Sequence, residues 1–386
     1  MNFLNSLFRL TGAACIAALG AGCAMAPLAP SRLADIDAAI RRAVDGGRLP
    51  GAVFLLDRDG AVHSAAHGRL SSEAGAAAVR ADTIFDAASL TKVLATAPAV
   101  LLLVEDGKVA LDAPLRRYFP DCEAGGLGAL TVRQLLTHTS GLPAGLPATP
   151  PWQGEDAAYA LACSRALTHA PGTAFRYSDV NFVLLGRLVK QVSGKGLDQF
   201  ARERLFVPLG MADTGFVPLD WAGPARSARI APTRPQAESA AGIVHDPTAR
   251  RMGGVSGSAG VFTTAADVAR FARMLLAGGM HEGRRVLGAD SVRLMSTVQS
   301  PPGVAETRAM GMDIASPFAR PRGALFPVGS FGHTGFTGCI LWIDPGSRTF
   351  YVFLSNRVYP DQTSDILDLY GELGTLAARA ASVGGR

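Results

Sequence analysis

The chain contains one Ser-x-x-Lys tetrad, Ser89-Leu90-Thr91-Lys92, and only four lysines among its 37 basic residues. On a helix, residues three apart share a face, so the Lys92 amine would lie near the Ser89 hydroxyl. A serine is a poor nucleophile until a base takes its proton, so this pair could perform nucleophilic catalysis. The alternative is a serine that caps a helix beside a solvent-facing lysine, and the tetrad alone does not separate the two.

The surroundings of the tetrad favour a buried helix. An apolar run follows at residues 93–104 and stops at Gly107. Ser89 would then stand at the N-terminal end, where free backbone N–H groups and the helix dipole favour a developing negative charge. Two tripeptides are further candidates, Tyr177-Ser178-Asp179 before a predicted helix and His333-Thr334-Gly335 at the end of a predicted strand. Each by itself is compatible with ordinary packing or a simple turn.

The remaining elements must bring these motifs together. Apolar spacing predicts a helix over 33–44 and strands over 51–57 and 61–66, joined by an Asp59-Gly60 turn. Helices are predicted at 132–137, 155–168, 180–192 and 197–205, and Thr264 with Asp267 predicts an acidic capping box for a helix to 276. Strands return at 310–314, 329–333, 338–343 and 349–355, before a last helix over 365–378. Strands at both ends imply one sheet assembled from the two ends of the chain.

Composition excludes several classes of function. Apolar residues make up 48% of the 386 residues and charged residues 18%, as in a globular protein. The net charge of +5 comes from scattered arginines, so we expect no nucleic-acid partner. Neither a glycine-rich phosphate loop nor zinc-ligand spacing occurs, so we expect no cofactor and no metal. Three cysteines lie in the body of the chain (Cys122, Cys163 and Cys339), so at least one thiol is free and the fold is no disulfide scaffold.

The N-terminus is typical of an export signal. Residues 1–26 combine one positive charge, an apolar segment at 10–21 and small residues. Gly20-Ala21-Gly22-Cys23 is similar to a bacterial lipobox with Cys23 as the lipidated residue, whereas Ala24-Met25-Ala26 would suit ordinary cleavage. We therefore expect an exported, periplasmic protein whose only contact with a membrane is a lipid anchor on Cys23, and a catalytic domain over residues 30–386.

The order of the three motifs resembles that of the penicillin-recognising serine hydrolases, the group of class C β-lactamases, DD-carboxypeptidases and serine esterases. The likeness covers nearly the whole mature chain and includes three further stretches, at 135–142, 253–260 and 335–338. It implies an α/β (α+β) fold of the β-lactamase/transpeptidase type. In such a fold an antiparallel sheet built from N- and C-terminal strands is flanked by helices, with an inserted helical subdomain at about 109–256.

The resemblance also implies roles for individual residues. Ser89 would be the acylated nucleophile, Lys92 its activator and Tyr177 the general base and acid. The backbone N–H groups of Ser89 and Phe336 would form the oxyanion hole. The substrate, a small molecule or a piece of peptidoglycan, would contact the following residues: Asp179, Asn181, His333, Thr334 and Gly335. A small residue at Gly335 would let the substrate lie along the strand edge.

Two positions depart from the family pattern. His333 stands where many relatives have lysine, so we expect its charge to change between about pH 5 and 8. Asp179 stands where asparagine is commoner, and a carboxylate beside Lys92 would favour the protonated amine and shift the role of base onto Tyr177. Asn181 is the candidate for the missing amide.

The expected function is an exported serine hydrolase that acts through a Ser89 acyl-enzyme on ester or D-alanyl amide substrates. A β-lactamase is the first alternative, and a peptidoglycan- or β-lactam-binding protein that does not turn over is the second. A Ser-His-Asp hydrolase of the α/β type is excluded because no Gly-x-Ser-x-Gly elbow occurs. His245-Asp246 is therefore expected to make a loop hydrogen bond and not to form a catalytic dyad.

Overall fold

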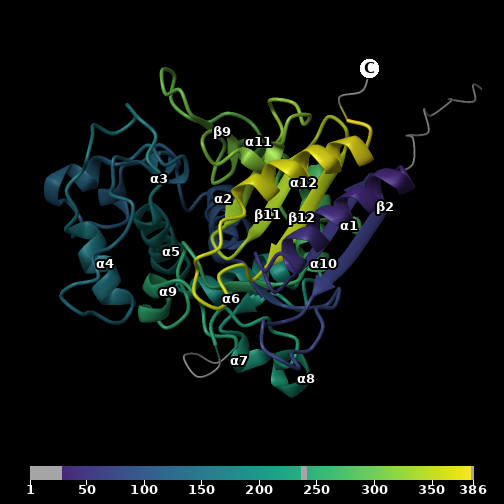
Figure 1. Cartoon of the computed structure of the whole chain (residues 1–386). Coiled ribbons are helices and arrows are strands. Elements are labelled where there is room, and N and C mark those ends of the chain that lie inside the picture. The colour runs from purple at the N-terminus through teal and green to yellow at the C-terminus, as the bar shows by residue number, and fades with distance from the viewer. Residues whose placement is uncertain (1–27, 236–240, 384–386) are drawn as a thin grey trace, which may run out of the picture.

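The computed structural model describes residues 28–235 and 241–383. The predicted signal peptide and Cys23 lie outside these residues. Figure 1 shows a sheet covered by helices, formed by the first and last parts of the described chain, beside a lobe of helices from the middle of the sequence.

The strands are β1 (Gly51–Arg58), β2 (Ala61–Gly68), β3 (Phe85–Asp86), β4 (Gly215–Phe216), β5 (Val261–Thr263), β6 (Met280–His281), β7 (Arg284–Arg285), β8 (Thr307–Arg308), β9 (Asp313–Ala315), β10 (Phe331–Gly335), β11 (Cys339–Asp344) and β12 (Thr349–Ser355). The helices are α1 (Pro30–Asp45), α2 (Ala97–Glu105), α3 (Val132–Leu136), α4 (Glu155–Cys163), α5 (Asp179–Ser193), α6 (Leu197–Ala201), α7 (Pro218–Trp221), α8 (Gly223–Ser227), α9 (Pro247–Arg251), α10 (Ala265–Leu276), α11 (Ala289–Ser296) and α12 (Leu367–Ala380).

The main sheet joins the two ends of the chain, as the sequence predicted. Its seven strands lie in the order β2-β1-β12-β11-β10-β9-β8, and every neighbouring pair is antiparallel. β1 pairs with β12 so that Ala52 faces Ser355. The β1–β2 turn is the predicted Asp59-Gly60 hairpin, and both residues have the positive φ that such a turn requires. The mixed α/β fold with an antiparallel sheet is therefore confirmed.

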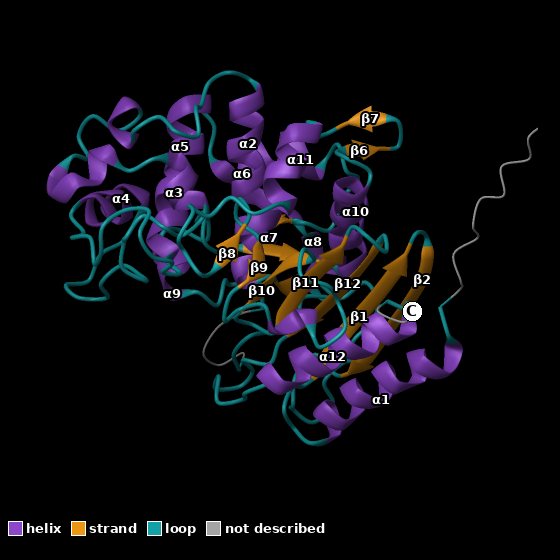
Figure 2. Ribbon diagram, turned by 90° about the horizontal axis from the view of Figure 1, so that it is seen from above, coloured by secondary structure: helices purple, strands orange, loops and turns teal. Residues whose placement is uncertain are grey.

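Alternating side chains give the sheet two buried faces. Phe54, Trp342 and Phe353 belong to a cluster with α1 and α12. Their neighbours along the strands, such as Val53 and Leu341, belong to the larger core with α2 and α10. Figure 2 shows α1 and α12 on one side of the sheet and α2, α10 and α11 on the other. The period of two along each strand thus places the nucleophile region against one face only.

The Ser89 segment enters this core irregularly. A short 3-10 turn, η1 (Ala88–Leu90), is followed by a wide π turn, η2 (Lys92–Thr96), and only then by regular α2. By length and composition residues 88–105 could span a membrane, and this is the one such segment among the described residues. However, 83% of it is buried inside the protein, so it is the core helix of the fold.

The start of α10 shows a partial agreement with the predicted capping box. The Thr264 hydroxyl accepts a hydrogen bond from the Asp267 N–H at 3.2 Å and so caps the helix. The Asp267 carboxylate does not reach back to Thr264. It accepts instead from the Asp213 N–H at 2.9 Å and from the Thr214 hydroxyl at 2.8 Å. Aspartate is one methylene shorter than the glutamate of a full capping box, and these partners occupy it.

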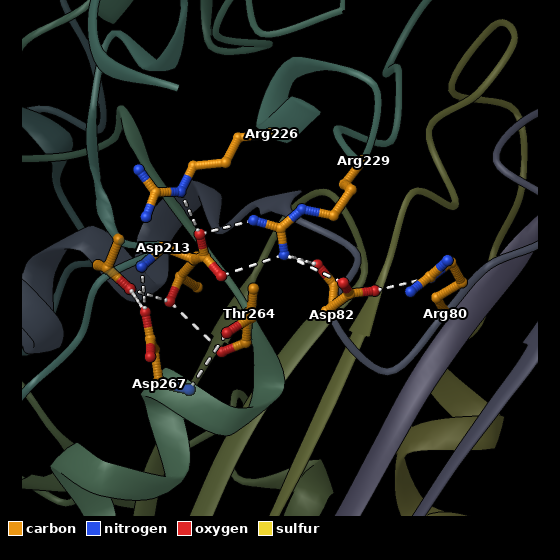
Figure 3. Close-up of polar contacts among 9 residues, drawn as sticks. Arg80, Asp82, Asp213, Arg226, Arg229, Thr264 and Asp267 are labelled. Atoms are coloured by element: carbon orange, nitrogen blue, oxygen red, sulfur yellow. Dashed lines mark hydrogen bonds and ion pairs between the residues drawn. The ribbon is translucent and has the colours of Figure 1, made fainter. Parts of the chain in front are cut away.

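A network of charged side chains extends from this cap toward β3, the strand that precedes Ser89 (Figure 3). The Asp213 carboxylate accepts from the side chains of Arg226 and Arg229, at 2.8 and 2.7 Å. Arg229 also donates to the Asp82 backbone carbonyl at 2.9 Å and forms an ion pair with its carboxylate. Asp82 lies three residues before β3, which leads into Ser89. The network therefore holds the segment that enters the nucleophile turn.

Some predicted boundaries were wrong. The helix predicted over 155–168 ends at Cys163, which is disulfide-bonded to Cys122. The strand predicted over 310–314 forms only at its end, as part of β9, because residues 310–312 make the turn from β8, in which Gly311 has a φ of 81°. The strand predicted over 329–333 begins at Phe331, since Ser330 closes a turn onto the Pro327 carbonyl.

Candidate active site

The tetrad places Ser89 and Lys92 in contact. Lys92 Nζ donates to Ser89 Oγ at 2.9 Å, and the Lys92 side chain is fully buried while Ser89 is partly exposed. Ala88 has a φ of 46°, a conformation that is uncommon for a residue with a side chain. The buried Asp86 carboxylate holds this turn by accepting the Ala88 N–H at 2.9 Å. The serine is therefore presented on a braced turn and not on a regular helix.

Three acceptors surround the Lys92 amine. Besides Ser89 Oγ, it donates to the Ser258 carbonyl at 2.8 Å and forms an ion pair with Asp179 Oδ1 at 2.7 Å. Burial alone would lower the pKa of Lys92, but the Asp179 carboxylate and Tyr177 outweigh burial and hold that pKa above its ordinary value. An ammonium has three N–H donors, so each finds an acceptor here. Lys92 is thus suited to be a cation that donates to Ser89.

Tyr177 lies immediately before α5 and is held by its neighbours. Its ring stacks on that of His138, with centroids 4.5 Å apart and an interplanar angle of 25°. Two cations lie close to the ring: Lys92 Nζ is 5.1 Å and the Arg308 guanidinium 6.0 Å from its centroid. These charges stabilise negative charge on the phenol oxygen, which is the form of the side chain that can take a proton.

His138 supports Tyr177 and was not identified as a site residue from the sequence. It is fully buried, and its Nδ1 accepts the Ser178 N–H at 3.0 Å and the Asn181 Nδ2–H at 3.2 Å. Burial, with Arg308 and Lys92 nearby, holds the pKa of His138 well below its ordinary value, so the ring is neutral. The sequence feature that could have identified His138 is its place in the 135–142 stretch. A lone histidine there does not reveal that its ring stacks on Tyr177.

The expectation that Asn181 supplies an amide at the site is wrong. The side chain is fully buried, its oxygen accepts from the Ser140 hydroxyl at 2.6 Å, and its nitrogen donates to His138. Residues two apart on a helix point about 200° away from each other, so Asp179 and Asn181 cannot face one site. Of these two residues, only Asp179 contacts Lys92.

His333 also differs from its expected role. It is 4% exposed, and its Nδ1–H donates to the Thr334 carbonyl at 2.7 Å. Burial, with Arg308 and Lys92 nearby, holds the pKa of His333 well below its ordinary value. The predicted change of charge between about pH 5 and 8 is therefore contradicted. Arg308, whose charge adds to the effect of burial on both histidines, is itself buried and paired with Asp313 at 3.0 Å.

The structure explains the glycine at position 335 differently from the expectation that it makes room for substrate. A Cβ at this position would lie 2.4 Å from the Ala87 carbonyl oxygen and 3.0 Å from Cys339 Cβ. The glycine therefore lets β10 pack against the nucleophile turn, and it leaves no additional room for substrate there. Thr334, the neighbour on the other face of the strand, is partly exposed.

A cavity of about 330 Å³ opens beside the nucleophile. It is lined by the following residues: Ala88, Ser89, Tyr177, Asp179, His245, Asp246, Pro247, Ser258, Ala259, Phe336 and Gln362. The turn that carries Phe336 is fixed to β3, because the Thr337 hydroxyl donates to the Asp86 carbonyl at 2.6 Å. Ser89, Tyr177, Asp179 and Phe336 are thus brought together, whereas Asn181 and His333 are not part of the lining.

The histidine and aspartate at 245–246 behave as expected for a loop. The His245 N–H donates to Asp86 Oδ2 at 2.7 Å, and Asp246 caps α9 by accepting the Ala249 N–H at 2.7 Å. Their presence in the cavity wall was not predicted. Over residues 28–235 and 241–383, no group of three or more histidine, cysteine or acidic side chains is arranged to hold a metal ion.

Comparison with known proteins agrees with this geometry. The model of the Beta-lactamase family matches residues 36–374. The chain is 30% identical over 367 residues to a putative D-alanyl-D-alanine carboxypeptidase of Escherichia coli O157:H7, covering 84% of this chain and 82% of the relative. It is 28% identical to an N-acetylmuramyl-L-alanine amidase of Bacillus subtilis, covering 86% and 82%. Among solved structures, a penicillin-binding protein homologue from Caulobacter crescentus has a TM-score of 0.71 at 22% identity, covering 92% of this chain and 99% of that one.

Proposed function

We propose, since the chain belongs to the Beta-lactamase family and is a serine hydrolase, that Ser89 is its acylated nucleophile and that it cleaves esters or D-alanyl amides. The observation that carries the proposal is the contact between the buried Lys92 Nζ and Ser89 Oγ, which lines the same cavity as Tyr177 and Asp179.

The contacts support a division of labour between Lys92 and Tyr177. Lys92 remains an ammonium, because all three of its N–H groups have acceptors and Asp179 favours its charge. Tyr177 acts as the phenolate, which the nearby Lys92 ammonium stabilises, and takes the proton of Ser89 Oγ as that oxygen forms a bond to the substrate carbonyl carbon. The backbone N–H groups of Ser89 and Phe336 stabilise the oxyanion, at about 3 kcal/mol for each donor.

The proton returns in the second half of the reaction. When the carbon–oxygen or carbon–nitrogen bond breaks, Tyr177 delivers the proton to the leaving group and the Ser89 ester remains. Water then attacks the acyl carbon while Tyr177 accepts one of its protons, and Ser89 Oγ leaves and regains a proton. Stacking on His138 fixes the ring of Tyr177 for both transfers.

A fluorophosphonate probe tests the nucleophile. It should label the protein at Ser89, and Ser89→Ala should abolish both labelling and turnover. The control Asp290→Asn changes an exposed carboxylate outside the cavity and should keep both. Labelling of another serine would refute the assignment. A stoichiometric burst of product without turnover would instead support the alternative of a binding protein that is acylated and stops.

The cavity gives less support to substrates that carry a carboxylate than to neutral esters and amides. A β-lactam carries a carboxylate, as does the C-terminus of a D-alanyl-D-alanine peptide, and such groups are held by cations. No lysine or arginine lines this cavity in the described parts of the chain, and His333 is neutral. Assays with p-nitrophenyl esters, a D-alanyl-D-alanine peptide and nitrocefin would rank the three substrate classes, and fast hydrolysis of nitrocefin would overturn this ranking.

Export to the periplasm is a further part of the proposal. The Cys122–Cys163 disulfide supports it, because such bonds persist in oxidising compartments. We propose that cleavage follows the lipobox-like site, which removes residues 1–22 and leaves Cys23 as the lipid-bearing first residue. Intact mass and metabolic labelling with palmitate decide between this product and a soluble one that begins at Pro27.

A further inference from the structure

A second cavity lies beside α6, α7 and α8, away from the catalytic site. Its volume is about 550 Å³, within the range of about 300–1,000 Å³ that is usual for small-molecule sites. None of the residues that line it also lines the catalytic cavity. The proposed chemistry of Ser89 therefore does not account for this second cavity.

The wall of the second cavity is largely apolar. Phe206, Met211 and Phe216 are buried, Trp221 is partly exposed, and Val207 is 62% exposed. The Trp221 indole N–H already donates to the Phe216 carbonyl at 2.7 Å, so the ring serves as an apolar surface with its one donor satisfied. Such a wall suits the apolar part of a ligand, which gains free energy when it leaves water.

Two uncommon backbone conformations position this wall. The segment η5 (Arg202–Phe206) is a π turn, and its first and last residues both line the cavity. The one other π turn in residues 28–235 and 241–383 is η2, which follows the nucleophile. Val217, which joins Phe216 to α7, has a φ of 45°, an outlier for a β-branched residue. Because π turns and strained residues concentrate at functional sites, both features point to a binding site here.

Two arginines line the cavity with guanidinium donors to spare. Arg202 is exposed, and within the described parts of the chain its side chain has no hydrogen bond or ion pair. Arg226 donates to Asp213 Oδ1 through Nε at 2.8 Å, which leaves its two Nη groups available. A guanidinium presents five N–H donors in a planar fork that matches a carboxylate.

The acidic groups nearby leave this positive charge in excess. Asp198 is the one carboxylate in the lining, and it is turned toward Gly196, where an added Cβ would lie 2.4 Å from Asp198 Oδ1. Glu203, next to Arg202, is bound by Lys195 and accepts from Gln199 Nε2 at 2.9 Å. Two guanidinium groups against one carboxylate therefore favour a ligand with negative charge.

We propose that the second cavity binds a small amphipathic carboxylate. The apolar body of the ligand packs against Phe206, Phe216 and Trp221, and its carboxylate pairs with the guanidinium of Arg202. Arg226 adds a second positive charge to the same lining. This inference goes beyond the proposed function and does not rest on it, because no group of the catalytic cavity takes part.

Isothermal titration calorimetry of the native protein with octanoate, octanol and octylamine tests the proposal. The three probes share one alkyl chain and differ in charge at pH 7. Octanoate should bind one-to-one and at least about threefold more tightly than octanol, because only the carboxylate gains an ion pair. Octylamine, which is a cation at this pH, should bind most weakly. Added salt should reduce the advantage of octanoate, because screening weakens the attraction.

Two variants assign the binding to this cavity. Arg202→Gln removes the charge from an exposed position and should weaken octanoate binding at least about threefold, with little change for octanol. Ala212→Trp adds bulk to the cavity from another exposed lining position and should abolish binding of both probes. Arg284→Gln, the matched control, changes an exposed arginine on β7 and should leave binding unchanged. All three variants should keep the native kcat/KM for ester hydrolysis.

Three outcomes would overturn the proposal. The first is that octanoate shows no saturable binding up to about 10 mM. The second is that octylamine binds as tightly as octanoate, because the arginines would then not select the charge of the ligand. The third is that binding persists in both Arg202→Gln and Ala212→Trp. If that binding disappears once the fluorophosphonate has blocked Ser89, the ligand occupies the catalytic cavity instead.

Discussion

Asp179→Asn is the sharpest test of how Lys92 works. The change removes a carboxylate 2.7 Å from Lys92 Nζ and nearly preserves its shape. An opposite charge at this distance shifts a pKa by about 1–3 units, or roughly 1.4–4 kcal/mol. The Asp179 side chain is 35% exposed, so solvent screening places the expected shift near the lower limit of about 1 unit. Burial of Lys92 continues to oppose its charge, and its pKa should therefore fall below that of the native protein.

The assay is the pH dependence of kcat/KM from pH 5 to 10.5, corrected for spontaneous hydrolysis. If the ammonium is the active form, the activity is present below the pKa of Lys92 and lost above it. The alkaline limb of Asp179→Asn should then lie about 1 unit below that of the native protein. The raised pKa of Lys92 also stabilises the fold at pH 7, and this contribution is lost as the pH rises through the higher folded pKa. Asp179→Asn should thus have the lower Tm at pH 7.

The opposite profile would refute this reasoning. If neutral Lys92 were the base, lowering its pKa would move the acid limb of the profile to lower pH and raise the activity at pH 7. Asp290→Asn, which changes the same charge at an exposed site, should shift neither limb.

Three further predictions concern Tyr177, Asp86 and the Cys122–Cys163 disulfide. Tyr177→Phe should lower kcat about 10²-fold or more with little change in Tm, and a kcat near the native value would mean that another group moves the proton. Burial raises the pKa of Asp86 to about 6, so this carboxyl is protonated more readily in the folded state than in the unfolded state. The native protein should therefore lose stability relative to Asp86→Asn as the pH rises from about 4 to 6, measured as the difference between their free energies of unfolding. A constant difference across this range in urea titrations would contradict the shifted pKa. Replacing both Cys122 and Cys163 by serine should lower the free energy of unfolding by about 2–4 kcal/mol, and reductant should then have no further effect on Tm, unlike in the native protein.

The sequence was most informative where the pattern is local and periodic. The hairpin at Asp59-Gly60, the strands at 338–343 and 349–355 and the terminal helices follow from alternation, apolar spacing and turn chemistry, and the structure has them within a few residues. Strands at both ends also predicted correctly that one sheet unites them. The Ser89–Lys92 contact could be expected as well, because the two residues are three positions apart and share one turn.

What could not be predicted depends on contacts between distant segments. Nothing in a tripeptide shows that His333 is buried beside Arg308, so its expected charge was wrong. Asn181 was assigned by its distance along the chain, whereas the direction of its side chain on α5 decides its partners. The placement of Asp246 in the cavity wall needs the packing of α9 against the nucleophile turn, which joins residues about 160 positions apart.

The pairing of β1 with β12 also determines when the chain can fold. Ala52 and Ser355 are about 300 positions apart, so the centre of the sheet stays open until nearly the whole chain has been synthesised, roughly 15–60 s at ordinary rates. Closing so long a loop costs entropy before any contact repays it, and folds dominated by such distant pairings form slowly. The sheet of a nascent chain of this topology therefore stays incomplete for as long as its C-terminal strand is missing. Removing β12 and α12 should leave a chain without a stable sheet, however intact its catalytic motifs.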